Sequence, residues 1–332
     1  MTRQTWLTGI TTSGTPHLGN YVGAIRPAIE ASRVEGRDGY YFLADYHALI
    51  KNQDPERLRR SRTEIAAAWL ALGLDTDRAM FYRQSDIPEI PELAWILTCS
   101  TAKGLMNRAH AYKGVVQANV EDGSAEPDRG ISMGLFSYPI LMSADILMFG
   151  ATHVPVGRDQ VQHLEMARDI AQRFNHHYGE HFVLPEVVVD EAPLLAGLDG
   201  RKMSKSYENT IPLFATSKQL RKSIMKIVTN SLEPGVPKDP EGSALFEIHR
   251  SFASEAQSAD FRQAFRDGIA WGDAKQRLFE LVDGQLAEPR ERYAALMANP
   301  GEIDAVLASG AERAREASRP FLARIREAVG VA

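Results

Sequence analysis

A short turn near the start of the chain carries the first residues that could bind a nucleotide. Thr12-Ser-Gly-Thr-Pro-His-Leu-Gly-Asn20 joins an apolar, strand-forming run at 5–10 to a segment with helical spacing. A helix start offers free backbone N–H groups and a positive dipole end to phosphates. His17 and Asn20 would share one helix face, and Gly19 would let a ligand ring approach the backbone. The alternative is an ordinary capped turn with a surface histidine.

A second group of chemically useful residues lies much later, in Asp199-Gly-Arg-Lys-Met-Ser-Lys-Ser206. Lys202 and Lys205 are three residues apart in a loop of small residues, so two ammonium groups could close over a polyphosphate while Met203 holds the loop on apolar surface. An ammonium group near a developing oxyanion stabilises a leaving pyrophosphate. A solvated basic loop is the alternative.

Alternating strands and helices must position these two sites. Apolar runs predict strands, and segments with helical spacing separate them. The predicted strands are 5–10, 40–44, 80–83 and 153–156. This alternation predicts right-handed crossovers and a doubly wound, parallel, Rossmann-like α/β sheet, with a ligand crevice at the carboxyl ends of its strands.

Helical additions to that sheet are predicted in the rest of the chain. The segment 85–128 is less regular and is interpreted as an inserted subdomain closed by a mobile loop. After Lys205 the strand patterns stop, and the helical patterns are 217–229, 243–252, 260–269, 274–297 and 303–329. Gly310 and Pro320 should bend or break the last of these helices.

The two loops together resemble the signatures of the class I aminoacyl-tRNA synthetases. Pro16-His-Leu-Gly-Asn20 resembles the HIGH motif, and Lys202-Met-Ser-Lys-Ser206 is identical to the second signature. The middle of the chain resembles the bacterial tryptophan branch of that family, and the similarity covers nearly the whole chain. The segments that carry it are Tyr138–Leu147, Val154–Gln160 and Gln162–Ile170.

The resemblance implies an enzyme that activates L-tryptophan with ATP and then transfers it to tRNA(Trp). His17 and Asn20 would contact the triphosphate, Lys202 and Lys205 would stabilise the leaving pyrophosphate, and the phosphates would hold Mg²⁺ without a metal site on the protein. The implied ATP-binding residues are Thr11, Thr12, Ser13, Gly19, Asn20, Gly157, Arg158, Asp159, Leu194, Lys202, Met203, Ser204, Lys205 and Ser206.

Asp145 fits the recognition of tryptophan in physical terms. It is the one charge in a strongly apolar segment, and burying a lone carboxylate is costly unless a donor meets it. An indole has one N–H donor and no acceptor, so its pocket needs an acceptor at one point of an apolar slot. The alternative is that Asp145 caps a neighbouring element. The expected tryptophan pocket consists of Leu7, Gly9, His47, Tyr138, Met142, Asp145, Val154, Val156 and Gln160.

The resemblance also implies a domain organisation and a homodimer. The chain is expected to contain a catalytic domain at 1–212 with an inserted dimerisation subdomain at about 85–130, a helical anticodon-binding domain at 213–300, and a C-terminal helix at 301–332 that packs back on the catalytic domain. Three residues differ from those common in the family, namely Leu7, Thr11 and Arg158. These differences remove no catalytic group, but they leave the affinity for the substrates open.

Composition limits the partners. The 332 residues carry a net charge of −5, which gives no support to nucleic-acid binding by the whole surface, and no DNA partner is expected. The stretch 201–226 nevertheless carries +6, and four of its cations share one helical face that is either solvated or faces tRNA: Lys218, Arg221, Lys222 and Lys226. A single cysteine, Cys99, and the lack of a signal-peptide or membrane-spanning pattern predict a cytoplasmic protein.

Three other functions remain open at this stage. A tyrosyl-tRNA synthetase shares the fold and both signatures, but its pocket would need a partner that can both donate to and accept from a phenol. A nucleotidylyltransferase of the same superfamily acting on a small metabolite, and a non-catalytic nucleotide-binding module, would both fail to charge tRNA.

Overall fold

The computed structural model describes residues 4–12, 14–189 and 194–332. A five-stranded sheet forms its centre, with the strand order β3-β2-β1-β4-β5 and parallel pairing throughout. The strands are β1 (Gln4–Ile10), β2 (Arg37–Leu43), β3 (Met80–Arg83), β4 (His153–Val156) and β5 (Glu186–Val189). The chain moves outward from β1 in one direction and then resumes at β4 on its other side. This arrangement confirms the predicted doubly wound sheet, and its crevice lies where β1 and β4 diverge.

The four predicted strands agree with the observed ones to within three residues, but β5 was not predicted. Val187-Val-Val189 is a β-branched run that favours a strand. However, β5 is an edge strand whose residues are all at least partly exposed. It therefore lacks the buried apolar pattern by which the other strands were predicted.

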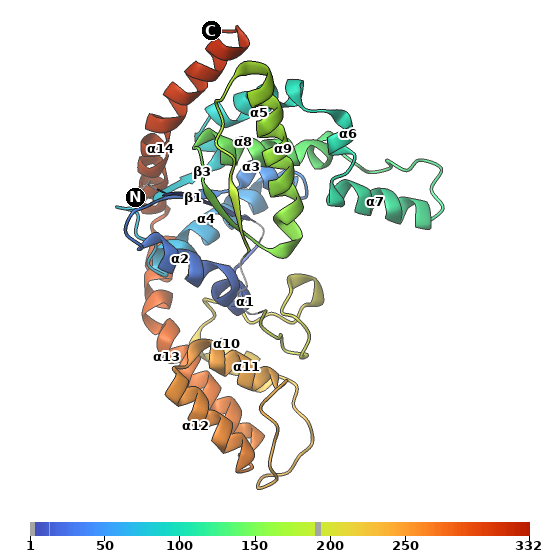
Figure 1. The fold of residues 1–332 in the computed structure, drawn as a ribbon. Coiled ribbons are helices and arrows are strands. Elements are labelled where there is room, and N and C mark those ends of the chain that lie inside the picture. Colours follow the sequence, from blue (N-terminus) through green and yellow to red (C-terminus); the bar gives the residue numbers. More distant parts are fainter. Residues whose placement is uncertain (1–3, 13, 190–193) are drawn as a thin grey trace.

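Helices cover both faces of the sheet, as Figure 1 shows. On one face, Leu7, Phe42 and Tyr82 of the strands pack with α5, α8 and α9. On the other face, Tyr41 and Phe81 pack with α2, α4 and the start of α14. The helices of the α/β part are α1 (Leu18–Asn20), α2 (Arg26–Ser32), α3 (Asp45–Ala48), α4 (Pro55–Ala71), α5 (Glu89–Ser100), α6 (Lys103–Met106), α7 (His110–Glu121), α8 (Met133–Met148) and α9 (Val161–Tyr178).

The segment predicted as an insertion forms α5, α6 and α7. Helices α6 and α7 project away from the sheet as an arm (Figure 1). Four short helical turns complete this half of the molecule, namely η1 (Tyr21–Ile25), η2 (Gln84–Asp86), η3 (Arg158–Gln160) and η4 (Lys205–Tyr207). Two of them, η2 and η3, follow the strands β3 and β4.

A helical body follows the second signature. It consists of α10 (Ser217–Met225), α11 (Ala244–Phe252), α12 (Glu255–Arg266) and the long α13 (Trp271–Ala298). Helix α12 starts five residues earlier than predicted, because Ser254 and Gln257 form a reciprocal cap at its beginning. The buried core of this body also includes Leu18, Val22 and Met203, so both signature segments pack against it.

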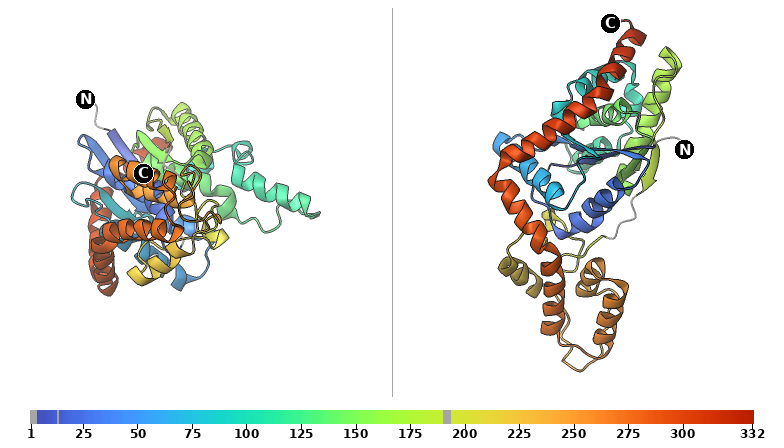
Figure 2. Two further views of the ribbon diagram at one scale, coloured as in Figure 1. Left: turned by 90° about the horizontal axis from the view of Figure 1, so that it is seen from below. Right: turned by 90° about the vertical axis from the view of Figure 1, so that its left-hand side faces the viewer.

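Helix α14 (Pro300–Val329) runs without a break from the end of α13 to the C-terminus (Figures 1 and 2). Gly310 and Pro320 were expected to bend or break this helix, and the predicted break does not occur at either residue. A methyl group added at Gly310 would lie 1.9 Å from the carbonyl oxygen of Phe81, so glycine allows α14 to approach β3 closely. Among the described residues, no helix combines the length and apolar character needed to cross a membrane.

Candidate active site

A cavity of about 940 Å³ opens at the carboxyl ends of β1 and β4. All nine residues of the predicted tryptophan pocket line it: Leu7, Gly9, His47, Tyr138, Met142, Asp145, Val154, Val156 and Gln160. They come from four separate parts of the chain, namely β1, α3, α8 and the β4–η3 segment. Phe42 and Ile146 add apolar wall that was not predicted. The crevice therefore contains a slot that is mostly apolar and has a few polar groups.

Asp145 is the buried charge of this slot, with 1% of its surface exposed. Its Oδ1 and Oδ2 accept hydrogen bonds from Gln84 Nε2 at 2.8 and 3.0 Å, and His47 Nε2 lies 2.9 Å from Oδ2. Burial raises the pKa of Asp145, while the hydrogen bonds and charge of His47 and the hydrogen bond of Gln84 oppose that rise. Its partners are thus the side chains of His47 and Gln84, rather than the backbone N–H groups that a capping role would require.

A second polar group lies where α8 and α9 meet η3. Tyr138 and His163 are joined by a 2.5 Å contact between the phenol oxygen and Nε2, and His163 Nδ1 lies 3.1 Å from Gln160 Oε1. Gln160 in turn donates to Asp159 at 2.8 Å. Burial raises the pKa of Tyr138 to about 12, so its phenol is protonated at neutral pH. His163 was not predicted, although it stands within a segment that carried the family resemblance.

The first signature forms a capped helix start next to the cavity. His17 Nδ1 accepts from Asn20 N at 3.3 Å, and His17 N donates to Asn20 Oδ1 at 3.1 Å. Burial, and then the charge of Lys205, lower the pKa of His17 to about 4. The imidazole is therefore neutral at pH 7. Because Nδ1 is an acceptor, the proton resides on Nε2, which makes Nε2 a donor suited to a phosphate oxygen.

The second signature packs directly on the first. Gly19 N donates to the sulfur of Met203 at 3.4 Å, and Met203 is buried. A methyl group added at Gly14, whose φ is +70°, would lie 3.0 Å from Lys205 Nζ. The fold therefore brings Lys205 to the turn that holds His17, although nearly 190 residues separate them in the sequence.

Asn209, which was not predicted, shapes the second loop. Its buried side chain accepts from Ser204 N at 2.8 Å and donates to Asp199 at 2.7 Å and to the carbonyl of Lys202 at 3.1 Å. These bonds hold both ends of the loop that carries the lysines. A polar residue shortly after the signature was the available signal.

The predicted ATP-binding residues divide into three groups. Thr11, Thr12, Gly157 and Asp159 line the cavity. The second group belongs to the two packed loops beside the cavity and consists of Gly19, Asn20 and Met203–Ser206. The third group has exposed side chains and consists of Arg158, Leu194 and Lys202. Ser13 lies outside the described residues.

Helix α4 supports the first turn with side chains that were not predicted. Ser61 Oγ donates to the carbonyl of Thr12 at 2.9 Å and accepts from Gly14 N at 2.7 Å. Glu64, one turn later, accepts from Thr15 Oγ1 at 3.1 Å. Arg57, one turn before Ser61, lines the cavity. The spacing of residues 57, 61 and 64 places them on one helix face, so a polar stripe was the signal in the sequence.

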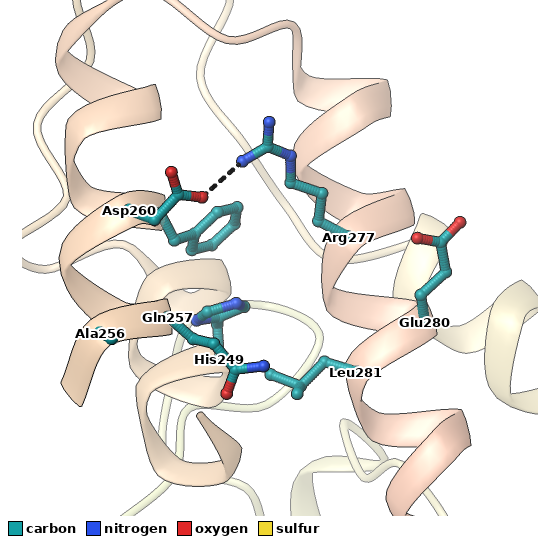
Figure 3. Close-up of a pocket in the computed structure, with 8 residues that line it drawn as sticks. His249, Ala256, Gln257, Asp260, Arg277, Glu280 and Leu281 are labelled. Carbon is teal, nitrogen blue, oxygen red and sulfur yellow. Dashed lines mark hydrogen bonds and ion pairs between the residues drawn. The ribbon is translucent and has the colours of Figure 1, made fainter. Parts of the chain in front are cut away.

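A second cavity, of about 560 Å³, lies in the helical body between α11, α12 and α13 (Figure 3). His249 stacks on Phe261 at 4.0 Å, and Asp260 pairs with Arg277 at 3.2 Å. Burial, followed by the charge of Arg277, lowers the pKa of His249 to about 4. No predicted site residue lies in this cavity. Among the described residues, no cluster of three or more His, Cys, Asp or Glu side chains could hold a metal ion.

Comparison with known proteins identifies the family. Residues 2–287 match the model of the class I tRNA synthetases specific for W and Y. The tryptophan–tRNA ligase of Pseudomonas aeruginosa is 64% identical, with 98% of this chain and 73% of that protein aligned. The one from Neisseria meningitidis is 58% identical over 100% of this chain and 99% of its own. The chain belongs to the bacterial tryptophan–tRNA ligases.

Solved structures agree with membership of the tryptophan–tRNA ligases. The tryptophanyl-tRNA synthetase of Campylobacter jejuni, in complex with ADP and tryptophan, aligns with a TM-score of 0.89 and 42% identity, covering 98% of this chain and 100% of that one. The tyrosyl-tRNA synthetase of Archaeoglobus fulgidus aligns with a TM-score of 0.64 and 20% identity, covering 88% and 90%. That likeness shows a shared fold alone.

Proposed function

We propose that this tryptophan–tRNA ligase binds L-tryptophan in the apolar slot around Asp145, activates it with ATP at the two packed signatures, and transfers it to tRNA(Trp). The observation that carries the proposal is the buried carboxylate of Asp145 in a slot whose walls are mostly apolar. Gln84 Nε2 is shared between both of its oxygens and His47 contacts Oδ2, so Oδ1 keeps room for a further donor. An indole N–H would complete the set.

The second polar group of the cavity, around Tyr138 and Gln160, suits the amino-acid end of tryptophan. The phenol of Tyr138 and the amide of Gln160 line the cavity together with Asp159. They offer acceptors for an ammonium group, while Met142, Val154 and Val156 would contact the ring. With both ends held, the carboxylate of tryptophan would face the first turn and the α-phosphate of ATP.

The triphosphate would lie between the first turn and the second signature. His17 Nε2 and the amide of Asn20 would contact the phosphates, and the Lys202 and Lys205 ammonium groups would neutralise the leaving pyrophosphate. Gly157 and Asp159 at the end of β4 would meet the nucleoside. Mg²⁺ would be held mainly by phosphate oxygens and would neutralise their charge. The reaction needs no protein nucleophile, because the carboxylate of tryptophan attacks phosphorus in line.

The larger assembly follows the same proposal. We expect a catalytic domain at 1–212 with a dimerisation insert at about 85–130, a tRNA-binding helical domain at 213–300, and a homodimer in the cytoplasm. The projecting arm of α6 and α7 and the exposed cations of α10 support these roles.

Amino-acid-dependent exchange of pyrophosphate into ATP, measured with each of the twenty amino acids, tests the proposal. Tryptophan should support exchange and tyrosine should not, because the open acceptor position on Asp145 Oδ1 suits an indole N–H, which only donates, whereas a phenol both donates and accepts. Charging of tRNA(Trp) should follow in the same preparation. Exchange with tyrosine instead, or exchange without charging, would contradict it.

A further inference from the structure

Gln84 lies at the start of η2, immediately after β3, and none of its surface is exposed. Its side-chain amide uses both of its ends. Nε2 donates to the two carboxylate oxygens of Asp145 at 2.8 and 3.0 Å, and Oε1 accepts from the backbone N–H of Tyr46 at 3.1 Å. This amide thus links the ends of two neighbouring strands to the charged point of the slot.

The backbone of Tyr46 fixes which way this amide faces. A backbone N–H can only donate, so the atom next to it must be the oxygen of Gln84. The NH₂ group is then directed at Asp145. If it exchanged places with the oxygen, the hydrogen bonds of the Gln84 amide to Asp145 and to Tyr46 N would all be lost. Gln84 therefore presents donors, and no acceptor, to the carboxylate.

Asp145 responds to this arrangement in two ways. The amide nitrogen contacts both oxygens and so orients the plane of the carboxylate, which leaves the open position of Oδ1 in a fixed direction. It also favours the ionised form, which can only accept. A buried carboxyl group without such donors takes up a proton and then both donates and accepts.

We propose that Gln84 is a positioning residue for amino-acid specificity, because its amide holds Asp145 as an oriented, acceptor-only partner for the indole N–H. This inference rests on the proposed function and adds to it a residue that does not itself contact tryptophan. Loss of Gln84 should weaken the interaction with the indole N–H while leaving the apolar slot in place.

The experiment compares tryptophan with β-(3-benzothienyl)alanine, in which sulfur replaces the indole N–H. Binding of both ligands is measured by equilibrium dialysis with the full-length protein and with Gln84→Leu. The Kd of tryptophan should rise about tenfold or more, as expected for a weakened hydrogen bond to a charged group, and that of the analogue less than twofold. Equal losses for both ligands would overturn the proposal, since a general disturbance of the slot would act on both.

A second variant preserves the shape of the side chain and adds a pH signature. In Gln84→Glu one oxygen can still accept from Tyr46 N, while the other faces Asp145 and must carry a proton to donate. The Kd of tryptophan should stay near that of the unmodified protein at low pH and rise at least tenfold as that proton is lost with increasing pH. A pH profile that parallels the unmodified protein would contradict the role of the NH₂ group.

Two controls separate the possible failures. Asn175→Leu removes another buried amide, on α9 and outside the cavity, and should leave both Kd values unchanged. Asp145→Asn tests the proposed function itself by the same pair of ligands. If Asp145→Asn leaves the ratio of the two Kd values unchanged, the indole contact is wrong; if it alters the ratio but neither Gln84 variant does, only the present inference fails.

Discussion

Lys205 shows how one side chain links the two signatures. Its ammonium group lies beside Gly14, and its charge contributes to the low pKa of His17. Burial lowers the pKa of Lys205 itself, against the opposing charge of Glu64. Lys205→Ala should therefore reduce pyrophosphate exchange by about 100-fold or more, since removal of one preorganised charge-stabilising group has an effect of that size. Tryptophan binding, measured by equilibrium dialysis, should change little.

Lys218→Ala is the matched control for Lys205→Ala. Lys218 is an exposed lysine on α10 that does not line the cavity. It should leave the exchange rate unaltered. Exchange that persists at the normal rate in Lys205→Ala would remove Lys205 from the catalytic group.

His17 couples the stability of the first turn to pH. Its pKa is about 4 in the folded chain and near the ordinary 6.5 when unfolded, so between these values the unfolded chain binds more protons. The free energy of unfolding should thus fall as the pH drops from about 6.5 to 4, by up to roughly 1.4 kcal/mol per unit from this group. His17→Asn keeps an N-cap residue but cannot titrate. Chemical denaturation across this range should give a smaller pH slope for His17→Asn, and equal slopes would contradict the burial of a neutral imidazole.

Among single residues, the sequence revealed those whose type is unusual in its surroundings. Asp145 stands alone in an apolar helix, and the two lysines stand three apart in a loop of small residues. Gln84, His163 and Asn209 were not predicted. Their partners lie on other elements, and polar residues after a strand or helix are common at any surface. Only the fold reveals that each of them is buried with its hydrogen bonds satisfied.

One face of helix α4 carries the polar residues 57, 61 and 64, and this face places Arg57 at the cavity. Among the described residues the guanidinium of Arg57 forms no ion pair, and its charge contributes to the lowered pKa of Lys205. An exposed guanidinium at the wall of the cavity suits a phosphate. Arg57→Ala should lower pyrophosphate exchange about tenfold through weaker ATP binding. Arg59→Ala removes a charge two residues away that does not line the cavity, and it should have no comparable effect. Equal rates in the two variants would exclude Arg57 from the site.

The contact between α14 and β3 depends on Gly310. A methyl group there would lie 1.9 Å from the carbonyl oxygen of Phe81, which is backbone and cannot move aside. Gly310→Ala should lower the free energy of unfolding by about 1–3 kcal/mol, as overpacking does. Gly272→Ala is the control, because a methyl group at this α13 position meets nothing within 4 Å. It should be neutral or stabilising. Urea titrations of both variants measure the difference, and a neutral Gly310→Ala would contradict the close approach.

At the level of elements, the periodicity of apolar residues predicted most helices and the four strands β1 to β4, which carry apolar runs. Its errors have physical causes. Gly310 favours a helix break in isolation, yet tertiary packing against β3 uses the same lack of a side chain. The strand β5 lies at an edge with both faces partly exposed, so no buried pattern marked it.

At the scale of the whole molecule, charge is distributed unevenly. Lys218, Arg221 and Lys222 are exposed on α10, in a chain whose net charge is −5. The composition alone argued against a uniformly basic surface, whereas the fold presents these cations together on the helical body. A local electrostatic surface of this kind is compatible with an acidic protein that handles tRNA.

The proposed homodimer makes its own prediction about exposed apolar surface. Trp95 on α5, within the insert, is 68% exposed, and Met133 at the start of α8 is 73% exposed. We propose that these two side chains belong to the surface that the partner subunit covers. In sedimentation velocity runs over a range of concentrations the unmodified protein should be a dimer.

Trp95→Lys should raise the dimer dissociation constant by about 30-fold or more, the effect of losing roughly 2 kcal/mol at an interface centre. Val331→Lys places the same charge on an exposed apolar residue near the C-terminus, and it should not alter association. A monomeric unmodified protein would contradict the assembly, while a Trp95→Lys dimer of unchanged affinity would move the interface away from α5.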